Sequence, residues 1–178
     1  MVELPILRMG LYGLLTFFTF IVFCLSCARL NYTNHLAPND PLNHGRSFYD
    51  PIVAEILVTT LFTIPWCICI IFSIHKRIEH PYLATFGTEI VGLSVLWVFW
   101  IIGAAIASNL WGSLSWCQHI EACRVLSAMV AFLWLSWLTL SAILGISLLF
   151  SFANKAFKEP LHGRWDPRIS RVTEMRQV

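Results

Sequence analysis

The sequence predicts an all-α integral membrane protein: a four-helix bundle with short loops. Hydrophobic residues make up 57% of the 178 residues and charged residues only 12%, whereas a soluble domain has about 45–50% and about 25%. Four apolar runs pass the roughly 18 residues that a transmembrane helix needs. The mean hydropathy of +0.70 agrees with this class. A net charge of +2 is too small for the dense basic face that nucleic-acid binding requires, so no nucleic-acid partner is expected.

The four spans are expected at residues 10–28, 52–74, 86–107 and 125–152. At about 1.5 Å per residue they match or exceed about 30 Å of hydrocarbon, and the last must tilt or protrude. The first run also resembles a secretory signal, because Arg8 precedes it and Ser26, Cys27 and Ala28 imitate a cleavage site. It exceeds the apolar region of about 7–15 residues in such signals, so a retained signal anchor is the simpler interpretation.

The distribution of Lys and Arg predicts that both termini are cytoplasmic. An even number of spans places the N-terminal residues 1–9, the loop between the second and third spans, and the tail 153–178 on one side. That side carries nine basic residues and the other carries three, and basic residues collect on the cytoplasmic side. From residue 154 onward the tail has six basic and three acidic residues, which favours attraction to an anionic lipid surface.

A carboxylate within the second span is a candidate functional group, because a charge at membrane depth is costly. Glu55 lies about one turn inside the outer end of that span. Arg29 and Arg124 lie at nearby depth, at the outer ends of the first and fourth spans. We therefore expect an ion pair between helices that orients the bundle.

The third span has a second carboxylate, Glu89, about one to two turns from its cytoplasmic end. Lys155, Lys76 or His75 could pair with it from the membrane boundary, and protonation is the other structural solution. A contact with a lipid headgroup or an ion is the functional alternative. Glu55 and Glu89 are on the order of 15 Å apart along the membrane normal, so no shared proton or metal site is expected.

The second outer loop contains Cys117 and Cys123, which we expect to form a disulfide if both face an oxidising compartment. Two unpaired thiols, or a short helix that keeps them apart, are the alternatives. The other cysteines lie within spans and are interpreted as small packing residues. Cys and His do not have zinc spacing, so neither a metal nor a cofactor is expected. Asn31 begins a glycosylation sequon close to the end of the first span, a weak signal.

Tryptophans and small residues mark the third and fourth spans. Trp97 with Trp100, and Trp134 with Trp137, are three residues apart and so share a helix face. We expect these rings to interlock the two helices; a ligand-stacking cage is the alternative. Small residues spaced four apart, such as Gly103 with Ala107, favour close helix packing, within one chain or between two copies.

Four segments together resemble the MARVEL-domain membrane proteins of fungi. They are residues 10–13 at the start of the first span, residues 46–51 leading into Glu55, residues 103–105 near the end of the third span, and the loop 111–123. The resemblance covers roughly residues 8–152 and implies a module for membrane apposition, lipid domains or vesicle traffic. Trp111 to Cys117 also resembles the claudin signature, which belongs in a long first outer loop rather than in the second, so the MARVEL resemblance is favoured.

The predicted function is a non-enzymatic organiser that contacts lipids, other membrane proteins or a second copy of itself, in the plasma membrane or a secretory-pathway organelle. A small transporter or channel subunit is the alternative. It is disfavoured because no midplane cluster of ionisable groups and no pair of broken helices is evident. An enzyme is not expected, since no nucleophile, base and orienting group can be assembled at one depth.

Overall fold

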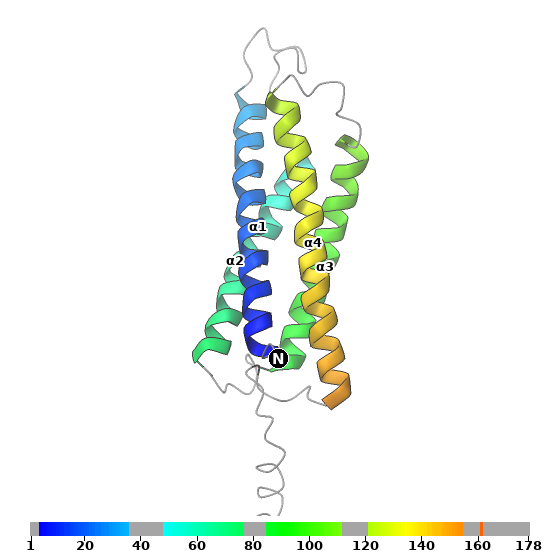
Figure 1. Ribbon diagram of the computed structural model, residues 1–178. Coiled ribbons are helices and arrows are strands. Elements are labelled where there is room, and N and C mark those ends of the chain that lie inside the picture. Colours follow the sequence, from blue (N-terminus) through cyan, green and yellow to red (C-terminus); the bar gives the residue numbers. More distant parts are fainter. Residues whose placement is uncertain (1–3, 36–47, 77–84, 112–120, 155–160, 162–178) are drawn as a thin grey trace, which may run out of the picture.

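The computed structural model describes residues 4–35, 48–76, 85–111, 121–154 and 161. In these residues the fold is all-α, with four helices: α1 (Leu4–Asn34), α2 (Pro51–Lys76), α3 (Phe86–Trp111) and α4 (Glu121–Asn154). Figure 1 shows them running alternately up and down. Each helix contains a stretch long and apolar enough to cross a membrane, which agrees with a multi-pass membrane protein.

The helices extend beyond the predicted spans. They have 31, 26, 26 and 34 residues, which corresponds to about 47, 39, 39 and 51 Å against about 30 Å of hydrocarbon. The difference is largest in α1, where the predicted span stopped between the charges of Arg8 and Arg29. Both arginines lie inside the helix with buried side chains. Because each has a partner for its charge, the helix continues past both.

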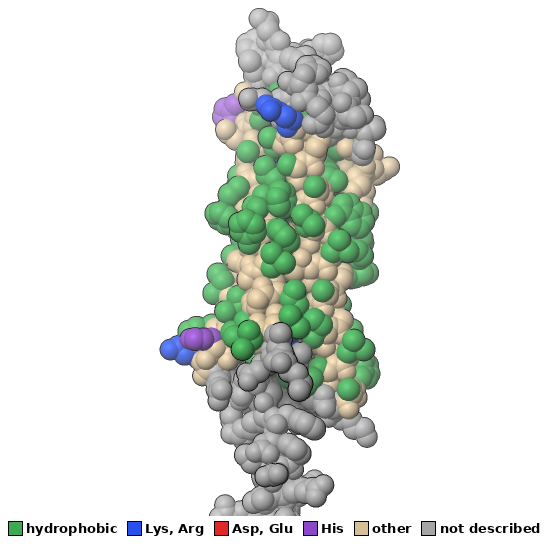
Figure 2. All heavy atoms as spheres, in the orientation of Figure 1, with side chains coloured by type: hydrophobic (Ala, Val, Ile, Leu, Met, Phe, Trp, Pro, Cys, Tyr) green, Lys and Arg blue, Asp and Glu red, His purple; other side chains and the backbone are tan. Residues whose placement is uncertain are grey.

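The bundle closes as a ring in which α1 contacts α2 and α4, and α3 contacts α4 extensively and α2 less extensively. The core consists of inward-facing side chains from all four helices, among them Leu15, Val53, Leu93, Met129 and Leu140. Large apolar side chains also face outward on every helix. In Figure 2 these form a broad hydrophobic zone between Lys, Arg and His side chains at the two ends. This pattern is typical of a protein that has lipid as its solvent.

Tryptophans join α3 to α4, as the sequence predicts. The rings of Trp97 and Trp137 lie 5.5 Å apart between centroids. Trp97 Nε1 donates to Ser141 Oγ at 2.8 Å, and Trp134 Nε1 donates to Ser108 Oγ at 2.9 Å. These small hydroxyl residues therefore let the helices approach and also satisfy the indole N–H groups, which have no water to bond in hydrocarbon.

Trp100 departs from this group, because it faces α2. Its side chain is buried, and its Nε1 donates to Thr63 Oγ1 at 3.1 Å. The Thr63 hydroxyl in turn donates to the Thr59 carbonyl oxygen at 2.7 Å. Trp100 is thus a polar link between α2 and α3, the pair of neighbours with the smallest contact.

Candidate functional site

A buried charge cluster lies at the end of the bundle where α1 and α3 begin. Arg8, Tyr12 and Glu89 are 1%, 0% and 1% exposed. Arg8 Nη2 donates to Glu89 Oε2, and Tyr12 Oη donates to Glu89 Oε1, both at 2.5 Å. Each carboxylate oxygen therefore has a donor from α1, and one of the donors carries the compensating positive charge.

Two further contacts of the Arg8 guanidinium come from other parts of the chain that meet at this end. Arg8 Nη1 donates to the carbonyl oxygen of Leu161 at 3.0 Å, and the guanidinium carbon lies 4.6 Å from the ring centroid of Phe86. The Phe86 ring in turn lies 5.0 Å from that of Phe150. One arginine therefore connects α1, α3 and the segment that follows α4.

The sequence interpretation placed Arg8 at the cytoplasmic boundary and sought the partner of Glu89 elsewhere. In the structure Glu89 forms its ion pair with Arg8, whereas His75 and Lys76, two of the expected partners, are exposed at the end of α2. Lys155, the third expected partner, lies outside the described residues. The spacing of Arg8 and Tyr12 was the available signal, because residues four apart present both donors on one helix face.

At the opposite end, Arg29 pairs with a carboxylate other than the expected one. Arg29 Nη2 and Nε donate to Asp50 Oδ2 at 3.1 and 3.2 Å. The guanidinium also lies 5.7 Å from the ring centroid of Phe48. The expected Arg29–Glu55 pair is therefore not formed, because Asp50, directly before α2, takes this position. Arg124 is exposed near the start of α4.

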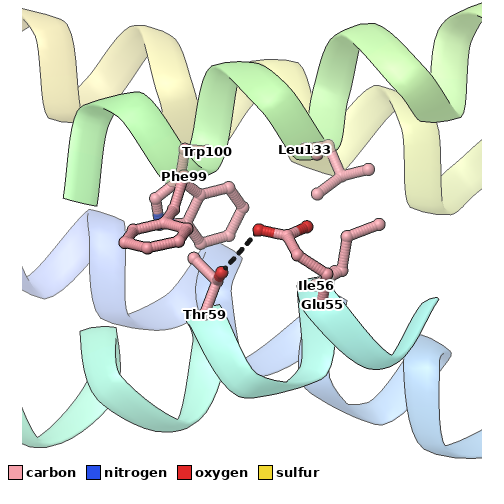
Figure 3. Close-up of a pocket in the computed structure, with 7 residues that line it drawn as sticks. Glu55, Ile56, Thr59, Phe99, Trp100 and Leu133 are labelled. Carbon is pink, nitrogen blue, oxygen red and sulfur yellow. Dashed lines mark hydrogen bonds between the residues drawn. The ribbon is translucent and has the colours of Figure 1, made fainter. Parts of the chain in front are cut away.

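Glu55 lies one turn inside α2, with its carboxylate directed between helices (Figure 3). Its Oε1 accepts a hydrogen bond from Thr59 Oγ1 at 3.0 Å. Its Oε2 is buried and has no hydrogen-bond partner among the described residues. A Cβ added at Gly103 would lie 3.0 Å from that oxygen, so the absence of a side chain on α3 leaves room for the carboxylate. Thus this carboxylate has one neutral donor and one unused acceptor.

Two spaces lie near this carboxylate. A small hollow, too narrow to hold a water molecule, is lined by Glu55 itself, Ile56, Thr59, Phe99, Trp100, Gly103 and Leu133. A larger apolar groove of about 430 Å³ lies between α2 and α3, lined by Val58, Thr59, Phe62, Trp66, Gly92, Val95, Leu96 and Phe99. Thr59 and Phe99 line both, so the hollow adjoins the groove. The volume of the groove lies within the range of about 300–1,000 Å³ found for ligand pockets.

The groove ends where Trp66 crosses from α2 to α3. A Cβ at Gly92 would lie 2.2 Å from Cζ2 of Trp66, so the indole ring occupies the space that any larger residue would need. The Nε1 of Trp66 is buried and has no hydrogen-bond partner among the described residues. Along α2, Val58 to Trp66 corresponds to about 12 Å of groove.

Other predicted groups lie outside these clusters. Cys117 lies outside the described residues, so its pairing with Cys123 stays a prediction. Among the intramembrane cysteines only Cys67 is buried, while Cys24, Cys27 and Cys69 face outward. Asn31 is exposed on α1, and its glycosylation stays a prediction.

Glu55 and Glu89 do not share a site: they lie near opposite ends of the bundle, as the sequence predicts. In the described part of the chain, His, Cys, Asp and Glu side chains do not form a group of three or more that could hold a metal ion. Comparison of the chain with protein-family models, with curated proteins and with solved structures finds no match.

Proposed function

We propose that the protein is a non-enzymatic, four-span membrane organiser that acts through contacts with lipids and with other membrane proteins or a second copy of itself. The observation that carries the proposal is the division of chemistry between inside and outside. Arg8, Glu89 and Arg29 are buried with paired charges, while Phe17, Phe62 and other large apolar side chains face outward. The outer surface of the bundle is therefore suited to contact lipid and the apolar helix faces of other membrane proteins.

The pairing of buried charges within the bundle supports an organiser over a transporter. Ionisable groups that move protons or ions must exchange partners, whereas both oxygens of Glu89 are held by donors from α1. The same cluster contacts Leu161, so the charges join elements together. A bundle fixed in this way presents its outer faces in a constant arrangement, which suits a scaffold.

Within this proposal, both termini face the cytoplasm, the membrane belongs to the cell surface or the secretory pathway, and Cys117 bonds to Cys123 on the outer side. The MARVEL resemblance of residues 8–152 implies the same kind of role, in membrane apposition, lipid domains or vesicle traffic. The disulfide is tested by the mass added by a maleimide reagent with and without prior reduction; equal labelling of Cys117 in both samples would contradict it.

Reconstitution in liposomes tests the function. We expect ion and solute flux equal to that of protein-free liposomes, together with lipids or homo-oligomers that co-purify from native membranes. Flux that disappears in Glu89→Gln but persists in Glu55→Gln would contradict the organiser and favour the alternative, a small transporter or channel subunit. Each variant replaces one intramembrane carboxylate by its isosteric amide, and size-exclusion profiles confirm folding before reconstitution, because Glu89→Gln also removes the counter-charge of Arg8.

A further inference from the structure

We propose that the groove between α2 and α3 binds a long-chain primary amine, with its ammonium group on Glu55 and its alkyl chain directed toward Trp66. The chemical pattern is that of a single-chain, phosphate-free cationic lipid. The proposal deepens the proposed function, on which it rests, because it names a lipid class that the bundle contacts.

The head group is assigned from the carboxylate. Glu55 Oε1 has a hydroxyl donor from Thr59, and Oε2 is buried without a donor among the described residues. The two buried arginines of α1 do not pair with Glu55, because Arg8 pairs with Glu89 and Arg29 pairs with Asp50. A carboxylate oxygen that water does not reach is stable when a donor and a positive charge reach it. A primary ammonium supplies both, as a charge-assisted hydrogen bond.

The tail is assigned from the groove. Its lining is apolar apart from Thr59, which lies at the Glu55 end, and Trp66, which lies at the other. Phe62 and Phe99 are 67% and 48% exposed, so their rings border a surface that is open to lipid. A volume of about 430 Å³ over a length of about 12 Å suits one alkyl chain laid along the helices. The depth of the site also fits, because Glu55 lies only about 6 Å from the start of α2.

The hollow around the carboxylate selects against larger heads. It is too narrow to hold a water molecule in this structure, and Phe99 lines both the hollow and the groove. The Phe99 ring must turn to admit a head group, which a half-exposed side chain facing lipid is able to do. A phosphate would bring negative charge beside Glu55 and needs more space. The free amine is therefore preferred over an aminophospholipid, whose ammonium is attached to a phosphate.

Photolabelling of the full chain in phosphatidylcholine nanodiscs tests the assignment. The probe is hexadecylamine with a diazirine in its chain, and the labelled peptides are identified by mass spectrometry. Hexadecylamine, hexadecanol, palmitate and lyso-phosphatidylethanolamine are the competitors. We expect labelling on α2 between Val58 and Trp66 and on α3 between Gly92 and Phe99, with hexadecylamine competing at about tenfold lower concentration than hexadecanol.

Variants separate the head from the tail. Glu55→Gln keeps the shape of the side chain and removes its charge, so the amine and the alcohol should then compete equally. Val95→Trp places a ring in the groove and should abolish labelling. Val98→Trp is its matched control, because Val98 is a similarly exposed valine on α3 that does not line the groove, and it should leave labelling unchanged. Circular dichroism and size-exclusion profiles confirm folding for each variant.

Three results would overturn the proposal: labelling outside the groove, an amine preference that survives in Glu55→Gln, or competition by lyso-phosphatidylethanolamine as strong as by hexadecylamine. Equal competition by hexadecanol in the unmodified chain would point to a neutral lipid and would also overturn it. The organiser function is judged by flux and co-purification, so a groove without an amine preference would leave that function standing.

Discussion

Replacing one member of the Arg8–Glu89 pair should destabilise the bundle more than replacing both. The pair is completely enclosed: Arg8 and Glu89 are each 1% exposed, and Tyr12 supplies the second donor to the carboxylate. Arg8→Met leaves a carboxylate with one neutral donor, and Glu89→Leu leaves a guanidinium with the Leu161 carbonyl and the Phe86 ring. In both cases a buried charge loses its counter-charge.

The magnitude follows from that uncompensated charge. Removing one partner of a buried ion pair costs about 3–5 kcal/mol, whereas exchanging the whole pair for apolar residues of similar volume is close to neutral. We therefore expect each single variant to lower the free energy of unfolding by about 3–5 kcal/mol, and the double variant by less than either single variant. Tyr12→Phe removes a hydrogen bond to a charged acceptor and should cost about 1.5–3 kcal/mol.

The assay is reversible unfolding in mixed micelles with increasing fractions of dodecyl sulfate, followed by far-ultraviolet circular dichroism. The unmodified protein, Arg8→Met, Glu89→Leu and the double variant are measured at the same protein and detergent concentrations. Additive losses, with the double variant as unstable as the sum of the singles, would refute the reasoning. That outcome would mean that the two side chains act independently and that the pair does not connect α1 to α3.

Three further predictions concern packing and topology. Thr63→Val should lower the free energy of unfolding by about 0.6 kcal/mol in the same micelle assay, Trp100→Phe by more because it also shrinks a fully buried side chain, and the double variant by no more than Trp100→Phe alone. Gly92→Ala should cost about 1–3 kcal/mol because its Cβ displaces the Trp66 ring, while Gly10→Ala, whose Cβ meets no atom within 4 Å, should not be destabilised by crowding. In intact cells, labels at Lys158 and in the loop around Cys117 should react from opposite faces of the membrane; reaction from one face would contradict the proposed topology.

The helices could be predicted from the sequence because apolar length is a local property. Each of the runs 52–74 and 86–107 lies within one helix of the structure, and the same holds for the first and last runs. The bounds of α1 were predicted too narrowly. A charge was treated as the end of a span, and the rule fails where a partner from another helix accompanies the charge into the bundle, as Glu89 does for Arg8.

The partners could not be predicted because they depend on how the helices rotate about their axes. Depth alone placed Arg29 near Glu55, but α2 turns the Glu55 carboxylate toward Gly103 on α3, while Asp50 in the preceding segment reaches Arg29. Sequence distance does not reveal this rotation. The groove was likewise beyond sequence reasoning, since its walls come from two helices and its end depends on the position of a single ring, that of Trp66.

The groove lies at a helix junction that neither ion pair crosses. Both involve α1: Arg8 connects it to α3 at one end, and Arg29 connects it to the segment before α2 at the other. Neither ion pair joins α2 directly to α3, and the contact between these two helices is the smallest in the ring. The Trp66 ring fills the space between α2 and α3 beside Gly92. The end of the groove nearest Glu55 stays open toward lipid. A carboxylate with an unused acceptor thus lies beside the smallest of the described helix interfaces, where an ordered lipid could enter without breaking either ion pair.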